Sequence, residues 1–95
     1  MRETPTARIL QEQWGQAIRT ARGSRPQTWL ARAVGVGQTT ISRIERGTYK
    51  LSPELMLGIA VAFGTELEQL FAYPPGLVSR ERHVEELRAR RRVPA

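Results

Sequence analysis

The most constraining feature of this sequence is the run over residues 27–46, QTWLARAVGVGQTTISRIER. Two helices that cross closely need a small side chain at the crossing, and Ala31 provides it. A tight turn between them needs a residue that adopts a left-handed backbone without steric cost, and Gly35 meets this need. Apolar residues recur at helical spacing on both sides of the turn, at Leu30, Val34, Val36, Ile41 and Ile44. The run therefore predicts two short helices packed against each other.

This spacing favours a helix-turn-helix motif over an ordinary helical hairpin. A hairpin does not need glycine at that offset from a small residue, nor a polar start to its second helix. The structural residues of the predicted motif are Ala31, Gly35, Ile41, Ile44 and Glu45.

Turn signals divide the rest of the chain into short helical pieces, and no segment has the alternation typical of a strand. We expect an all-α chain with helices over residues 4 or 5 to 22, 26–33, 38–46 and 53–63. A capping box over residues 65–68 predicts a short helix ending at Phe71 or Ala72, and Ser79 is expected to cap a helix to about Arg91. Residues 1–76 are predicted to form one domain and residues 77–95 an Arg-rich extension.

The outward positions of the helix over residues 38–46 carry amides, hydroxyls and guanidinium groups: Gln38, Thr39, Ser42, Arg43 and Arg46. Glutamine pairs with adenine, arginine with guanine, and the threonine methyl contacts thymine. An ordinary solvated face carries Glu and Lys in mixed order, whereas Glu45 is the one acid in this helix. The composition of this face favours the reading of DNA bases.

The charge of the chain is concentrated around the same motif. The net charge is +6, from 15 basic and 9 acidic residues. Residues 19–50 contain seven basic residues against Glu45 alone, and the bases and acids of the remaining 63 residues cancel. This distribution is typical of a phosphate-binding surface. A membrane-binding helix would need apolar residues exposed to lipid, and here they are committed to the hairpin core.

The composition also argues against catalysis. The chain has no Asp and no Cys, and His83 is its single histidine. A Ser-His-Asp triad, a thiol nucleophile, a zinc ribbon and a multi-histidine metal site are therefore excluded. We expect no enzyme activity, cofactor or metal. The N-terminus has no apolar segment typical of a secretory signal, so we expect a cytoplasmic protein.

Residues 14–71 resemble the Cro/repressor-type (XRE) helix-turn-helix domain. The resemblance rests on residues 14–19, 27–31 and 36–47, on Ser52-Pro53, and on Phe63-Gly64. It implies a five-helix, lambda-repressor-like domain that binds double-stranded DNA as a dimer, with its third helix in the major groove. Two departures are Pro26, where the family has a hydroxyl cap, and Gly37, which replaces the cap of the third helix.

The resemblance also assigns residues to roles. It implies that Gln38, Thr39 and Arg43 read bases, and that Gln27 contacts a phosphate and braces the first of them. Phosphate contacts are expected at Thr40, Ser42, Arg46, Thr48 and Lys50, and the basic segment adds Arg25. Glu45 matches a glutamate that pairs with an arginine of the first helix, for which both Arg19 and Arg22 are candidates.

Several alternatives remain open at this point. The helix over residues 53–63 is apolar almost all round, so its outer side is covered by the first helix and the tail or forms a homodimer interface with the fifth helix and Tyr73. The tail is interpreted as a solvated or partly disordered extension, with a phosphate-gripping arm and a partner-binding helix as alternatives; Glu86 and Arg90 would support its helix. The predicted function is a dimeric transcription regulator, a repressor on a palindromic operator. The alternatives are an antitoxin that binds a protein and regulates its own operon, and a controller protein of a phage or restriction system.

Overall fold

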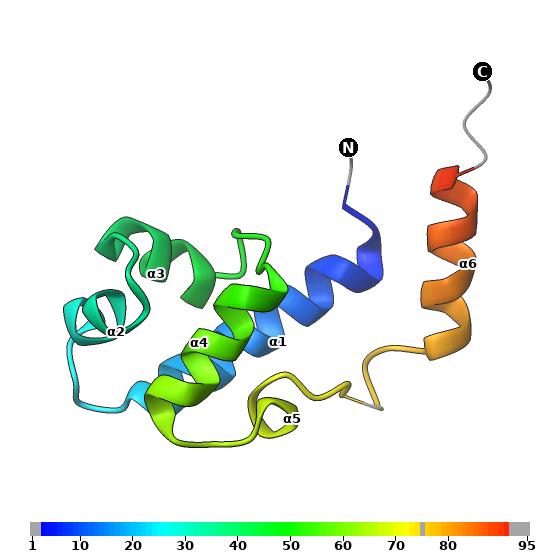
Figure 1. Cartoon of the computed structure of the whole chain (residues 1–95). Helices are drawn as coiled ribbons and strands as arrows, with labels where there is room; N and C mark the ends of the chain where they lie inside the picture. Colours follow the sequence, from blue (N-terminus) through cyan, green and yellow to red (C-terminus); the bar gives the residue numbers. More distant parts are fainter. Residues whose placement is uncertain (1–2, 75, 92–95) are drawn as a thin grey trace.

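The computed structural model describes residues 3–74 and 76–91, and within them it contains helices and no strand (Figure 1). The all-α prediction is therefore confirmed. The six helices are α1 (Pro5–Arg22), α2 (Gln27–Val34), α3 (Gln38–Glu45), α4 (Pro53–Phe63), α5 (Leu67–Leu70) and α6 (Arg80–Arg91).

The helices begin where short polar side chains can accept hydrogen bonds from the first free backbone amides. The Thr4 hydroxyl accepts from the Ala7 amide at 3.1 Å, and the Ser52 hydroxyl accepts from the Leu55 amide at 3.2 Å. The hydroxyl of Ser79 accepts from the Arg82 amide at 3.2 Å. These three starts lie where the sequence predicts them.

The predicted capping box at Thr65 is wrong. The residue before α5 is Glu66, whose side chain makes no capping bond, and the Thr65 hydroxyl contacts the side chain of Gln69 instead. The physical reason is that Thr65 belongs to the end of α4, where its amide donates to the Ala60 carbonyl at 3.0 Å beside the left-handed Gly64. Smaller corrections concern Pro26 and Arg46, which flank α2 and α3 rather than belong to them.

The core lies where α1, α2, α3 and α4 meet. Its fully buried large side chains come one or two from each helix: Ile18, Leu30, Ile41, Ile44 and Ile59. Gly35 adopts a left-handed conformation with φ +74° and turns the chain from α2 into α3. The indole Nε1 of Trp14 donates to the Ala72 carbonyl at 2.9 Å, which fixes the segment after α5 on α1. The packing thereby holds α3 with one face buried and the other in solvent.

The crossing of α1 and α3 depends on a glycine that the sequence analysis did not single out for packing. A Cβ atom on Gly15 would lie 2.4 Å from the Ile44 carbonyl oxygen and 2.8 Å from that of Glu45. The backbones of the two helices therefore approach so closely that no side chain fits between them. This contact sets how deeply the C-terminal end of α3 sits on α1.

In the tail, residues 80–91 form the helix expected after Ser79, and this helix contacts α1. Glu86 contacts the Thr6 amide at 3.2 Å and lies 3.6 Å from Arg82, so its expected pairing with Arg90 is not what the structure contains.

On α4, Leu57 and Val61 stay 57% and 71% exposed. The expected cover from the first helix and the tail therefore does not reach these two residues.

Candidate nucleic-acid interface

The exposed face of α3 carries the residues that the sequence predicts to read bases. Gln38, Thr39 and Arg43 are exposed, and so is Arg46 directly after the helix. Thr40 and Ser42 are half-buried at the edges of this face. The arrangement follows from the helical period, because burying Ile41 and Ile44 turns the positions between them toward solvent.

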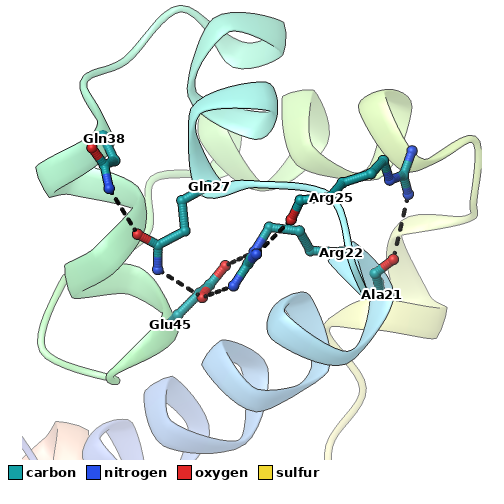
Figure 2. A network of polar contacts seen from close by, with 6 residues as sticks. All are labelled: Ala21, Arg22, Arg25, Gln27, Gln38 and Glu45. Carbon is teal, nitrogen blue, oxygen red and sulfur yellow. Dashed lines mark hydrogen bonds and ion pairs between the residues drawn. The ribbon is translucent and has the colours of Figure 1, made fainter.

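The acid of α3 points the other way, into the protein. The Glu45 carboxylate accepts from Arg22 Nε at 2.7 Å and from Arg22 Nη2 at 2.9 Å (Figure 2). The two side chains are 3% and 14% exposed, so this bidentate pair lies largely out of water. Of the two arginines considered from the sequence, Arg22 is the partner and Arg19 is exposed. The outward face of α3 is consequently free of acidic groups.

A relay of amides leads from this ion pair to the first exposed position of α3. Gln27 Nε2 donates to Glu45 Oε1 at 3.0 Å, and Gln38 Nε2 donates to Gln27 Oε1 at 3.3 Å (Figure 2). A carboxylate only accepts hydrogen bonds, so Gln27 must direct its NH2 group toward Glu45. Its carbonyl oxygen is then left to accept from Gln38. The relay thus orients Gln38, whose side-chain carbonyl oxygen remains available to a ligand.

The ion pair is in its charged form at neutral pH. Burial by itself would raise the pKa of Glu45, but hydrogen bonds from Arg22 and Gln27 and the charges of Arg22 and Arg19 hold that pKa below its ordinary value. The hydrogen bond with Glu45 raises the pKa of Arg22 against a smaller opposing effect of burial. The clamp between α1 and α3 is therefore insensitive to pH near neutrality.

Arg25, in the link between α1 and α2, is held on an aromatic surface, and its side chain extends away from Gln38 (Figure 2). Its guanidinium carbon lies 3.8 Å from the centre of the Trp29 ring and 5.6 Å from that of Phe63. The Trp29 and Phe63 rings contact each other with centroids 5.6 Å apart, which joins α2 to α4. A guanidinium stacked on an indole loses mobility but keeps its charge and its outward donors. The charge of Arg25 predicted a phosphate contact, but nothing in the sequence predicted its stacking on Trp29 and Phe63.

The loop after α3 places two more of the expected residues beside it. Thr48 and Lys50 are both exposed. The Thr48 hydroxyl, however, donates to the Arg43 carbonyl at 3.2 Å, and its amide donates to the same oxygen at 3.0 Å. Its single hydroxyl hydrogen is already used in closing the C-terminal end of α3, whereas the ammonium group of Lys50 reaches into solvent.

The expected site residues therefore fall into three groups. The structure brings Gln27, Gln38 and Glu45 into one hydrogen-bonded relay and exposes Thr39, Arg43 and Arg46 next to it. Arg25 and Lys50 lie outside α3, in the α1–α2 link and the α3–α4 loop. From the sequence, the arginine that positions Glu45 could be narrowed to Arg19 or Arg22. Nothing in the sequence predicted the close approach of α1 and α3 at Gly15.

No helix in residues 3–74 or 76–91 combines the length and the apolar character needed to cross a membrane.

Comparisons with known proteins match the same region. A family model described as helix-turn-helix matches residues 18–70, from the last turns of α1 to the end of α5. A protein of Methanocaldococcus jannaschii, named as an uncharacterized HTH-type transcriptional regulator, is 43% identical over 44 residues. The match covers 46% of this chain and 67% of that protein. No solved structure matches significantly.

Proposed function

Because this chain belongs to the helix-turn-helix family of DNA-binding transcription regulators, we propose that it is a repressor that binds a palindromic operator as a homodimer. In this proposal α3 enters the major groove, with Gln38, Thr39 and Arg43 contacting base edges. Phosphate contacts come from Gln27, Thr40, Ser42 and Arg46, and from Arg25 and Lys50 outside α3. Thr48 contributes one only if its hydroxyl turns away from the Arg43 carbonyl to which it donates.

The observation that carries the proposal is the acid-free outer face of α3 and the relay behind it. Glu45 is turned inward onto Arg22, so the exposed side chains of α3 are neutral donors and acceptors or cations. Gln38 is oriented through Gln27, and a side chain held in place before binding loses less entropy when it meets a base. Direct readout of bases needs this combination of fixed polar groups and favourable charge.

The homodimer is supported by the apolar side of α4. Leu57 and Val61 are one helical turn apart and are the most exposed apolar side chains of this helix. Two copies joined through α4 and α5 would present two α3 helices to successive major grooves, ~34 Å apart. A dimer of this kind requires an operator with two related half-sites.

Selection of bound duplexes from a random DNA pool tests this function directly. A recovered palindrome would support dimeric readout and give the spacing of its half-sites. A pool that remains random would contradict sequence-specific binding and leave only attraction to phosphates.

The recognition face is tested with the selected operator. Arg43→Ala should weaken operator binding by about 1–3 kcal/mol and relax the preference at one base position. Lys50→Ala serves as the matched control, because losing a phosphate contact should weaken binding to all sequences alike. If Arg43→Ala binds the operator as well as the wild type does, the assigned recognition face is wrong.

The interface is tested separately by light scattering of the free protein. The wild type should have twice the chain mass of 10.7 kDa, and Val61→Arg should have the mass of one chain. Leu77→Arg is the control, because Leu77 is 55% exposed but lies outside α4 and α5, and it should remain dimeric. A wild-type monomer at the concentrations that saturate the operator would contradict the proposed interface.

A further inference from the structure

The C-terminal helix α6 is fixed to the protein through Glu86 and His83, while most of its arginines stay exposed. The Glu86 carboxylate accepts from the Thr6 amide at 3.2 Å, in the first turn of α1, and its side chain is 14% exposed. An acid at this place is favoured because the free amides of a helix N-terminus carry partial positive charge. At the base of α6, His83 packs edge-on against Tyr73 with ring centroids 6.2 Å apart. These contacts make α6 part of the folded domain.

The charge that remains on α6 is concentrated in its last turns. Arg88, Arg90 and Arg91 lie there, and none of them forms an ion pair with another residue of the described ranges. Of the three acids of the helix, Glu86 faces α1, and Glu81 accepts from the Ser79 hydroxyl at 3.0 Å in the first turn. Glu85 is exposed one turn before Arg88 and forms no ion pair with another described residue. Arg88 and Arg91 are exposed, so the C-terminal half of α6 presents unneutralised guanidinium groups.

This basic helix stands next to the DNA interface proposed above. His83 of α6 and Lys50 of the α3–α4 loop line the same small pocket, together with Leu51. In Figure 1, α3 lies at the left and α6 at the right of the molecule, with the loop after α3 and the N-terminal part of α1 between them. Lys50, in the loop after α3, therefore lies close to the first turns of α6, and Arg88 and Arg91 follow His83 further along that helix.

We propose, on the premise that α3 binds duplex DNA, that α6 extends the phosphate-binding surface and that Arg88 and Arg91 contact backbone phosphates beyond the bases read by α3. These arginines carry charge and no base readout, so they add affinity without changing the preferred sequence. Each phosphate neutralised by the protein releases counterions, which gives the contact a specific dependence on salt.

The test compares full-length protein with the double variant Arg88→Gln/Arg91→Gln, measured by fluorescence anisotropy on the selected operator and on an unrelated duplex between 0.05 and 0.5 M salt. Losing two phosphate contacts should lower the slope of log K against log salt by about 1.8, since each contributes about 0.9. At 0.15 M salt this corresponds to an affinity roughly 30-fold weaker on both duplexes. The double variant Arg88→Lys/Arg91→Lys keeps both charges and should retain the wild-type slope.

Three results would overturn the proposal. An unchanged slope and affinity in the glutamine variant, with operator binding still lost in Arg43→Ala, would leave the proposed function standing and remove α6 from the interface. Weaker binding with an unchanged slope would show that these arginines act through stability rather than phosphates. Absence of duplex binding by the wild type would remove both the proposed function and the role of α6.

Discussion

Replacing Gly15 by alanine should destabilise the protein, although alanine is the better helix former. The added Cβ would lie 2.4 Å from the Ile44 carbonyl oxygen, whereas ordinary contacts of this kind begin at 3.4 Å. The helices α1 and α3 must therefore separate locally by about 1 Å, the difference between these distances. Both obstructing atoms are backbone oxygens, so no side-chain rotation can relieve the contact.

The size of the effect follows from two opposing contributions. Overpacking of a well-packed core costs about 1–3 kcal/mol, and a contact with backbone belongs at the upper end of this range. Alanine in the interior of a helix recovers about 1 kcal/mol relative to glycine. The net loss in the free energy of unfolding is about 2 kcal/mol, which lowers the melting temperature of a domain of this size by roughly 8–16 °C.

Gly58→Ala is the matched control, because it makes the same substitution inside α4 at a position with space. A Cβ there would meet Val34 Cγ1 at 3.7 Å, an ordinary contact. This variant should be more stable than the wild type by about 1 kcal/mol. Thermal and urea unfolding, followed by circular dichroism, give both values. If Gly15→Ala is stabilised as Gly58→Ala is, the close approach of α1 and α3 is not what fixes α3, and the reasoning fails.

Three further changes test the contacts around α1. Glu45→Gln leaves the mostly buried guanidinium of Arg22 without its carboxylate, so in urea denaturation it should lower the free energy of unfolding by about 3 kcal/mol. Glu85 is exposed, so the control Glu85→Gln should stay within about 0.5 kcal/mol of the wild type. Because folding lowers the pKa of Glu45, the stabilisation from its ion pair with Arg22 is complete above the ordinary value of about 4.3 and is lost as the pH falls through the lower folded pKa. The difference in free energy of unfolding between the wild type and Glu45→Gln should therefore shrink below that pH. A difference that stays constant in acid would speak against the ion pair. Trp14→Phe removes the indole donor to the Ala72 carbonyl and should cost about 1 kcal/mol in the same denaturation assay; an unchanged midpoint would mean that this bond does not hold the segment after α5.

Local patterns predicted much of the fold. The period of apolar residues located the helices, and the hydroxyls of Thr4, Ser52 and Ser79 marked the starts of three of them. These signals work because each depends on neighbours within a few positions along the chain. Thr65 shows the limit of such signals, since its capping sequence competes with the end of α4, and the backbone bond to Ala60 takes precedence.

The candidate site was predictable in its residue types and, through the family resemblance, in the brace of Gln27 on Gln38, but its other connections were not predictable. The sequence predicted polar and basic residues on one face of α3 because burial of Ile41 and Ile44 on one side of the helix turns the opposite side toward solvent. It could not choose between Arg19 and Arg22, which are only three positions apart, because the choice depends on how α1 is rotated against α3. The contact of Glu86 with Thr6, 80 positions away, had no local signal at all.

By itself, the sequence determined the helices, the turn at Gly35 and the concentration of positive charge around residues 19–50. These are properties of short segments and of composition, and they hold whatever the packing is. The tertiary structure decided which of the two candidate arginines holds Glu45 and that Gln27 is itself bonded to this carboxylate. It also decided that α6 lies against α1 beside Lys50. The reason is that both outcomes depend on the distance and rotation between helices, which Gly15 and the shared core fix only once the chain has folded.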